Sequence, residues 1–140
     1  MTLDTILLIG HGSREQSGND EIFAFAEQWR QRQPGWRIEV CFIEFSEITM
    51  GEGLRRAAAG AHRVVVVPLI LNAAGHVKMD IPQAIDGARL QFPLVQFLYA
   101  PHLTACDPIL QILRRRLKGA MQALDMPDPT TTGVVLLGRG

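Results

Sequence analysis

The run Val64-Val65-Val66-Val67-Pro68-Leu69-Ile70-Leu71 is the feature that most restricts the fold of this 140-residue chain. A continuous series of β-branched and apolar residues is typical of a strand that is buried on both faces, as strands of parallel sheets are. Parallel strands need crossover connections, which are usually helices. The run therefore predicts an α/β protein.

The rest of the chain alternates strand and helix patterns around that run. Strands are expected over residues 5–10, 37–45, 64–71, 95–99 and 133–137. Helices are expected over residues 20–33, 50–60 and 80–90 and from residue 107 onward. This alternation predicts a flavodoxin-like, three-layer α/β/α fold with a central parallel sheet of four to five strands. The expected strand order is 2-1-3-4, so the first and third strands should be neighbours.

The end of the chain repeats part of its beginning. Val135-Leu136-Leu137-Gly138-Arg139-Gly140 matches Leu7-Leu8-Ile9-Gly10-His11-Gly12 in pattern, with arginine in place of histidine. We therefore expect an α/β domain over residues 1–125, followed over 126–140 by a linker and the first strand of a missing second half. In the last helix, the apolar spacing predicts an inner side formed by Ile109, Leu113 and Leu117.

The overall charge excludes partners that a strong global field would attract. The 14 Lys and Arg side chains balance 14 Asp and Glu side chains, so neither nucleic acid nor a membrane surface is an expected partner. No signal-peptide pattern precedes the first strand, and no apolar run approaches the ~20 residues that cross a bilayer. We expect a cytoplasmic protein in which Cys41 and Cys106 are free thiols.

Two histidines follow strand-like runs at matching places. His11 comes directly after residues 5–10, and His76 follows residues 64–71 through a short loop. Because ligands of open α/β sheets bind at the carboxyl ends of the strands, both imidazoles should face one crevice. Glu44, near the end of the second strand, should approach from the other side. Imidazole and carboxylate are suitable ligands for divalent cobalt, iron, nickel or zinc.

Each histidine motif also has a simpler interpretation. Residues 10–14 fit a tight strand-to-helix turn, and His76 fits the capped start of a helix. A histidine-dependent phosphatase-like enzyme is a further alternative, but such sites have an arginine before the histidine, where this chain has Gly10. His62 precedes the third strand, at the opposite end of the sheet, and His102 lies one strand further out, so both are weaker candidates.

With these residues in place, the chain resembles the sirohydrochlorin chelatases, the type II chelatases that insert cobalt or iron into a tetrapyrrole. The resemblance covers nearly the whole chain and depends on three segments, residues 8–14, 41–47 and 67–82. It implies a chelatase-like fold and identifies the chain as the amino-terminal half of a long, two-domain form. It further implies that His11 and His76 are the metal-binding, catalytic pair, with Glu44 as a third, acidic site residue.

The resemblance implies insertion of divalent cobalt or iron into sirohydrochlorin, in cobalamin or siroheme biosynthesis. The metal is a substrate, and no nucleotide is expected because the chain has no phosphate-binding glycine loop. Ser13, Arg14 and Lys78 are the expected partners of the acidic groups of the macrocycle. The expected assembly is a homodimer or a complex with the missing carboxyl-terminal half. The alternative from another class is a non-catalytic module that binds metal or tetrapyrrole.

Overall fold

A parallel sheet forms the centre of the structure, a computed structural model that describes residues 4–72, 74–126 and 128–138 but not the side chain of His76. The strands in the described part are β1 (Asp4–Gly10), β2 (Arg37–Phe42), β3 (Arg63–Pro68) and β4 (Gln96–Tyr99). Their order is β2-β1-β3-β4, which confirms the predicted order and makes β1 and β3 neighbours. Parallel pairing places the carboxyl ends of all these strands at one edge of the sheet.

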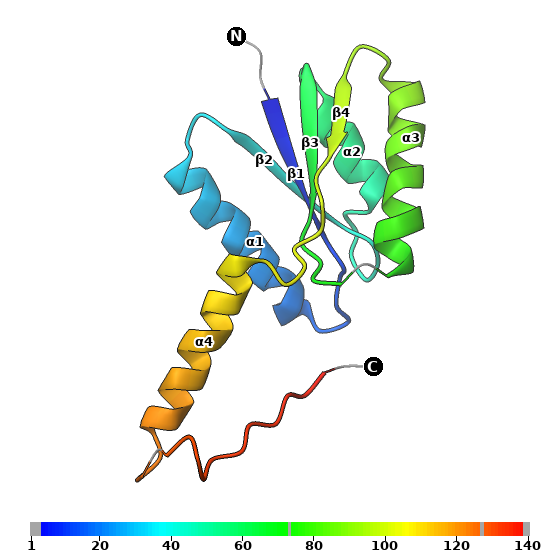
Figure 1. Cartoon of the computed structure of the whole chain (residues 1–140). Helices are drawn as coiled ribbons and strands as arrows, with labels where there is room; N and C mark the ends of the chain where they lie inside the picture. The colour runs from blue at the N-terminus through cyan, green and yellow to red at the C-terminus, as the bar shows by residue number, and fades with distance from the viewer. Residues whose placement is uncertain (1–3, 73, 127, 139–140) are drawn as a thin grey trace. The chain divides into compact units, whose positions relative to one another are not determined.

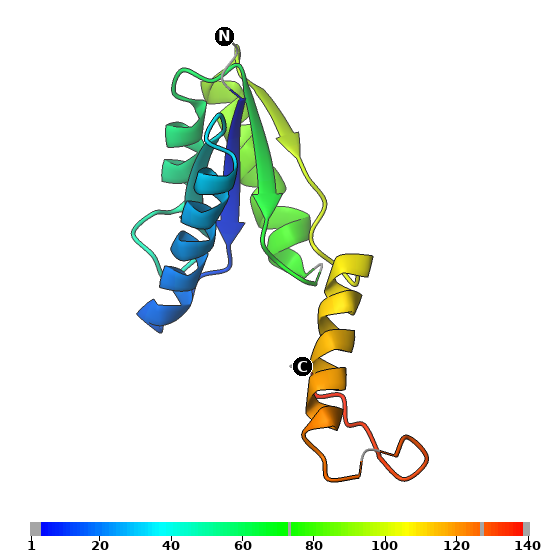
Figure 2. The ribbon, with the colours of Figure 1, turned by 90° about the vertical axis from the view of Figure 1, so that its left-hand side faces the viewer.

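Helices cover both faces of this sheet. α1 (Gln16–Arg32) lies on one face, and α2 (Met50–Ala58) and α3 (Ile81–Gln91) lie on the other (Figures 1 and 2). Because strand side chains alternate between the two faces, each face has its own core. The core on the α1 side contains Leu8, Ala26, Ile38, Val40 and Phe42. The core on the α2 and α3 side contains Leu7, Ile9, Leu54, Val64, Val66, Ile81 and Ile85. The predicted three-layer fold is thereby confirmed.

Three boundaries differ from the predicted ones near the carboxyl edge of the sheet, one of them the end of β3, which stops at Pro68 and not at residue 71. α1 begins earlier than expected, at Gln16, after the N-cap residue Glu15. In the turn before the helix, the Ser13 hydroxyl accepts a hydrogen bond from the Glu15 N–H (3.1 Å). β2 ends earlier than expected, at Phe42. Phe45, the last residue of the predicted strand, has a φ of 53°, in the left-handed region that a strand does not contain, so the strand cannot reach it.

The chain divides into two compact units, Met1–Thr104 and Ala105–Gly140. The second unit contains α4 (Asp107–Gln122), which has no buried residue. The predicted inner side of this helix is therefore wrong: Ile109 is only partly buried, and Leu113 and Leu117 are exposed. None of the helices in the described residues is long and apolar enough to cross a bilayer.

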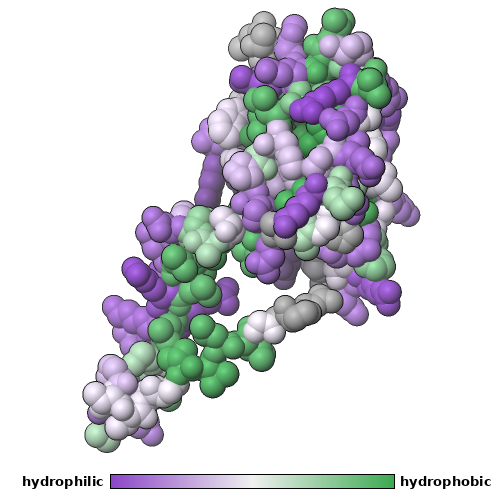
Figure 3. Space-filling model, turned by 45° about the vertical axis from the view of Figure 1, so that its right-hand side comes forward, coloured by the Kyte–Doolittle hydropathy of each residue, from purple (hydrophilic) through white to green (hydrophobic). Residues whose placement is uncertain are grey.

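The predicted strand over residues 133–137 is not formed. Its apolar side chains are exposed instead, and Figure 3 shows apolar residues at the surface of this second unit. A strand is stable only when a neighbouring strand pairs with it, and the described part of this unit contains none. The domain boundary expected after residue 125 stays a prediction.

Candidate metal site at the carboxyl edge of the sheet

The carboxyl ends of β1 and β2 bring His11 and Glu44 together. Nδ1 of His11 lies 3.4 Å from Oε1 of Glu44, and the two side chains are 51% and 40% exposed. The pairing of β1 with β2 continues past both strands, because the Ile43 N–H donates to Gly10 O (3.0 Å) and the Glu44 N–H donates to His11 O (3.1 Å). The structure thus places the two side chains next to each other, and their roles stay predictions.

Gly12 permits this close approach of the two loops. Its φ is +96°, which residues with a Cβ rarely adopt. A methyl group at this position would lie 1.7 Å from the carbonyl oxygen of Glu44. The backbone that follows His11 therefore presses against Glu44, and it does so because residue 12 has no side chain.

Asn19, which the sequence analysis did not identify, joins the same two loops. It lies in α1 and is 3% exposed. Its Oδ1 accepts a hydrogen bond from the Ser13 N–H (2.9 Å), and its Nδ2 donates to Ser13 O (3.2 Å) and Phe45 O (3.1 Å). In the sequence, an asparagine between a polar turn and a helix most often indicates the turn itself.

His76 is the first residue of η1 (His76–Asp80), a π-helical turn between β3 and α3. Turns of this kind are rare and are frequently found at functional sites. The hydroxyl of Tyr99, at the end of β4, donates to Val77 O (2.9 Å), and burial raises the pKa of this phenol, so it stays a donor. The side chain of His76 lies outside the described part, so the convergence of His11 and His76 stays a prediction.

The residues expected to contact the macrocycle lie on the loops that follow β1 and β3. The guanidinium of Arg14 lies over the ring of Phe45, with Cζ 5.0 Å from the ring centroid. The Ser13 hydroxyl accepts from the Glu15 N–H, and Lys78 is exposed in η1. Their contacts with substrate stay predictions.

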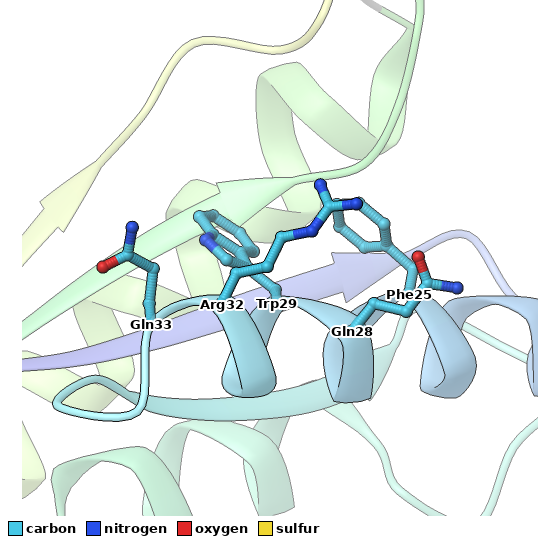
Figure 4. Close-up of a pocket in the computed structure, with 5 residues that line it drawn as sticks. All are labelled: Phe25, Gln28, Trp29, Arg32 and Gln33. Atoms are coloured by element: carbon cyan, nitrogen blue, oxygen red, sulfur yellow. The ribbon is translucent and has the colours of Figure 1, made fainter.

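Other candidate positions in the described part do not add ligands to this pair. No three His, Cys, Asp or Glu side chains come together among the described residues. Cys41 is buried, and burial raises its pKa to about 12, so the thiol stays neutral. A hollow of about 260 Å³ lies at the other end of α1 and contains no metal-ligating side chain; it is lined by Phe25, Gln28, Trp29, Arg32 and Gln33 (Figure 4).

An open parallel sheet with an imidazole and a carboxylate at its carboxyl edge defines the class of α/β proteins that have a candidate ligand site at that edge. The chain belongs to the CbiX family, whose model matches residues 5–120. It is 37% identical over 141 residues to a sirohydrochlorin cobaltochelatase of Priestia megaterium, covering 99% of this chain and 45% of the relative. It is 32% identical over 139 residues to a sirohydrochlorin ferrochelatase of the same species, covering 99% of this chain and 51% of the relative.

The chain thus spans about half the length of these curated relatives. A shorter relative is the sirohydrochlorin cobaltochelatase of Methanococcus aeolicus, which is 25% identical over 84% of this chain and 99% of its own length. Among solved structures, the sirohydrochlorin chelatase SirB from Bacillus subtilis subspecies spizizenii in complex with cobalt is 30% identical, with a TM-score of 0.77. The match covers 84% of this chain and 51% of that one, and it confirms the chelatase-like fold.

Proposed function

We propose that this chain inserts a divalent metal, cobalt or iron, into sirohydrochlorin, with His11 and His76 as metal ligands and Glu44 as their acidic partner. The observation that carries this proposal is the 3.4 Å distance between His11 Nδ1 and Glu44 Oε1. Two ligand atoms that each lie about 2.1 Å from one tetrahedral ion, as around zinc, are separated by about 3.4 Å. The pair therefore has the spacing of two ligands that share one ion, and η1 would supply the third.

Metal insertion also requires a proton acceptor, because two pyrrole N–H protons must leave the macrocycle. A neutral imidazole and a carboxylate are both suitable acceptors near neutral pH. Since about two fifths of the Glu44 side chain is exposed, a proton taken up there has direct access to solvent. The same partial exposure leaves the metal accessible to an incoming macrocycle.

The surroundings of the pair match a ligand with apolar faces and acidic substituents. Phe45, Leu71 and Met79 are exposed apolar side chains on the loops after β2 and β3 and on η1. Arg14 stacks on Phe45, so a cation adjoins that apolar surface. We propose that the macrocycle lies against these apolar groups while Arg14, Ser13 and Lys78 bind its acetate and propionate groups.

An absorption assay tests the proposal. The purified chain is mixed with sirohydrochlorin and cobalt, or with ferrous iron under anaerobic conditions, and the protein-free rate is subtracted. We expect His11→Ala and His76→Ala each to lower the rate on the order of 100-fold or more, and Glu44→Gln to lower it less. His62→Ala, an exposed histidine at the other end of the sheet, is the matched control and should keep the wild-type rate. A His11→Ala chain with the wild-type rate would refute the proposed roles.

A binding module without turnover is the second candidate, and it is favoured because no third His, Cys, Asp or Glu joins His11 and Glu44 among the described residues. The same assay separates the two candidates, because a module would change the spectrum of sirohydrochlorin or cobalt without forming the metallated product. Whether the active form is a homodimer is measured on the same samples by sedimentation.

A further inference from the structure

We infer that Asn19 is a positioning residue that holds the loops of His11 and Glu44 in the geometry that binds metal. The inference has two parts. The loop part, that Asn19 holds the two loops in place, is independent of the proposed function. The metal part, that this geometry binds metal, rests on the proposed function. Asn19 is not itself proposed as a ligand, because both its Oδ1 and its Nδ2 bind backbone groups. One buried side chain thus contacts the loop of each proposed ligand.

The first contact fixes the loop that carries His11. Asn19 Oδ1 accepts a hydrogen bond from the Ser13 N–H (2.9 Å), and Asn19 Nδ2 donates to Ser13 O (3.2 Å). The side-chain amide thus pairs with both backbone polar groups of Ser13, as the backbone of a neighbouring strand does. Ser13 is two residues from His11, and Gly12 between them lies against the backbone of Glu44. Holding Ser13 at two atoms therefore restricts the direction in which the chain leaves His11.

The second contact fixes the loop that carries Glu44. Phe45 follows Glu44 directly and has a φ of 53°, which a residue other than glycine keeps only where its surroundings impose it. The hydrogen bond from Asn19 Nδ2 to Phe45 O, 3.1 Å long, is such a constraint. Asn19 therefore couples the backbone on either side of the imidazole–carboxylate pair.

Removing this side chain should loosen both loops together. In Asn19→Ala, the part-buried Ser13 N–H and the carbonyls of Ser13 and Phe45 lose these partners, and the loops are then free to move toward water to replace them. The distance between His11 and Glu44 would then no longer be held at one value. Groups that orient metal ligands typically change metal affinity on the order of 10- to 100-fold when they are replaced.

The test measures the affinity of the full chain for cobalt, without sirohydrochlorin. Cobalt binding is monitored through the d–d absorption of the bound ion. The variants are Asn19→Ala and Asn19→Asp; the second keeps the acceptor for the Ser13 N–H and loses the donor to Ser13 O and Phe45 O. The control is Ala26→Gly, a fully buried position two turns further along α1, which weakens the helix away from the site. Amide hydrogen exchange is measured on the same metal-free chains.

We expect cobalt affinity to fall on the order of tenfold in both Asn19 variants, with an altered d–d spectrum, and to stay unchanged in Ala26→Gly. The amides of Ser13 and Glu44 should exchange faster in Asn19→Ala while those of Leu7 and Val66 do not. Affinity within twofold of wild type, or uniform acceleration of all amides, would overturn the inference. If wild type binds no cobalt, the proposed function and the metal part of the inference are both wrong. The amide exchange of the metal-free chains then tests by itself whether Asn19 holds the two loops.

Discussion

At the scale of single residues, the proximity of His11 and Glu44 depends on Gly12, whose φ is positive and whose Cα faces the backbone of Glu44. We expect Gly12→Ala to lower the free energy of unfolding by about 2 kcal/mol or more, because the methyl group meets a carbonyl oxygen and the backbone conformation is strained. Metal affinity should fall with it, since the two loops must separate. Urea unfolding and cobalt titration measure the two effects.

The same substitution at Gly87 is the control for this prediction. Gly87 lies in α3, and a Cβ there would have no neighbour within 4 Å. Replacing a helical glycine with alanine should therefore raise stability by up to about 1 kcal/mol, the opposite sign. If Gly12→Ala were as stable as wild type, the close packing of the loop of His11 against Glu44 would not be essential.

The sequence predicted the proximity of His11 and Glu44 because position along a strand was sufficient for it. His11 and Glu44 were identified because each lies near the carboxyl end of an apolar run, and parallel strands bring those ends together. Asn19 could not be found in this way. Its partners are backbone atoms, one of them 26 positions away in the chain, and a bond to a backbone atom requires no particular side chain there.

At the scale of elements, the strands and helices of the first unit were predictable because their apolar residues alternate or recur with regular spacing. In α3, for example, Ile81, Ile85 and Ala88 recur with helical spacing, and all are buried. The π-helical turn η1 before it was not expected, because a single turn is too short to show a period of its own. A tertiary hydrogen bond, from the hydroxyl of Tyr99 on β4 to Val77 O, contacts this turn.

We expect Tyr99→Phe to lower the free energy of unfolding by about 1 kcal/mol at pH 7, because it removes the hydrogen bond to Val77 O and keeps the ring. Burial raises the pKa of Tyr99 above its ordinary value. Its contribution is therefore complete below the pKa of the unfolded chain, about 10, and is lost as pH rises through the folded value. Urea unfolding of wild type and Tyr99→Phe is measured from pH 7 to 11. The difference between their free energies of unfolding should be constant up to about pH 10 and should become smaller above it. Equal stability at pH 7 would show that this bond does not stabilise η1.

At the scale of the whole molecule, buried area is unequally distributed between the two units. The first unit contains both hydrophobic cores, whereas α4 in the second has an apolar stripe and no buried residue. The apolar spacing of that helix correctly predicted its amphipathic character. It could not predict burial, because burial depends on a partner surface that the pattern of one helix does not specify.

The unit with less buried area should have the faster amide exchange. A helix of 16 residues without a packing partner has marginal stability in water. The amides of Asp107–Gln122 should therefore exchange at rates within about one or two orders of magnitude of the rate in an unfolded chain. The amides of β1 and β3 should exchange only when the whole first unit unfolds. Exchange measured by mass spectrometry at low micromolar concentration checks this. Repeating it at a hundredfold higher concentration adds a second outcome: protection of α4 that grows with concentration would show that a second copy covers Leu113 and Leu117, as the expected homodimer requires. Strong protection of α4 at every concentration would contradict the prediction, because it would mean that the stripe is covered within a single chain.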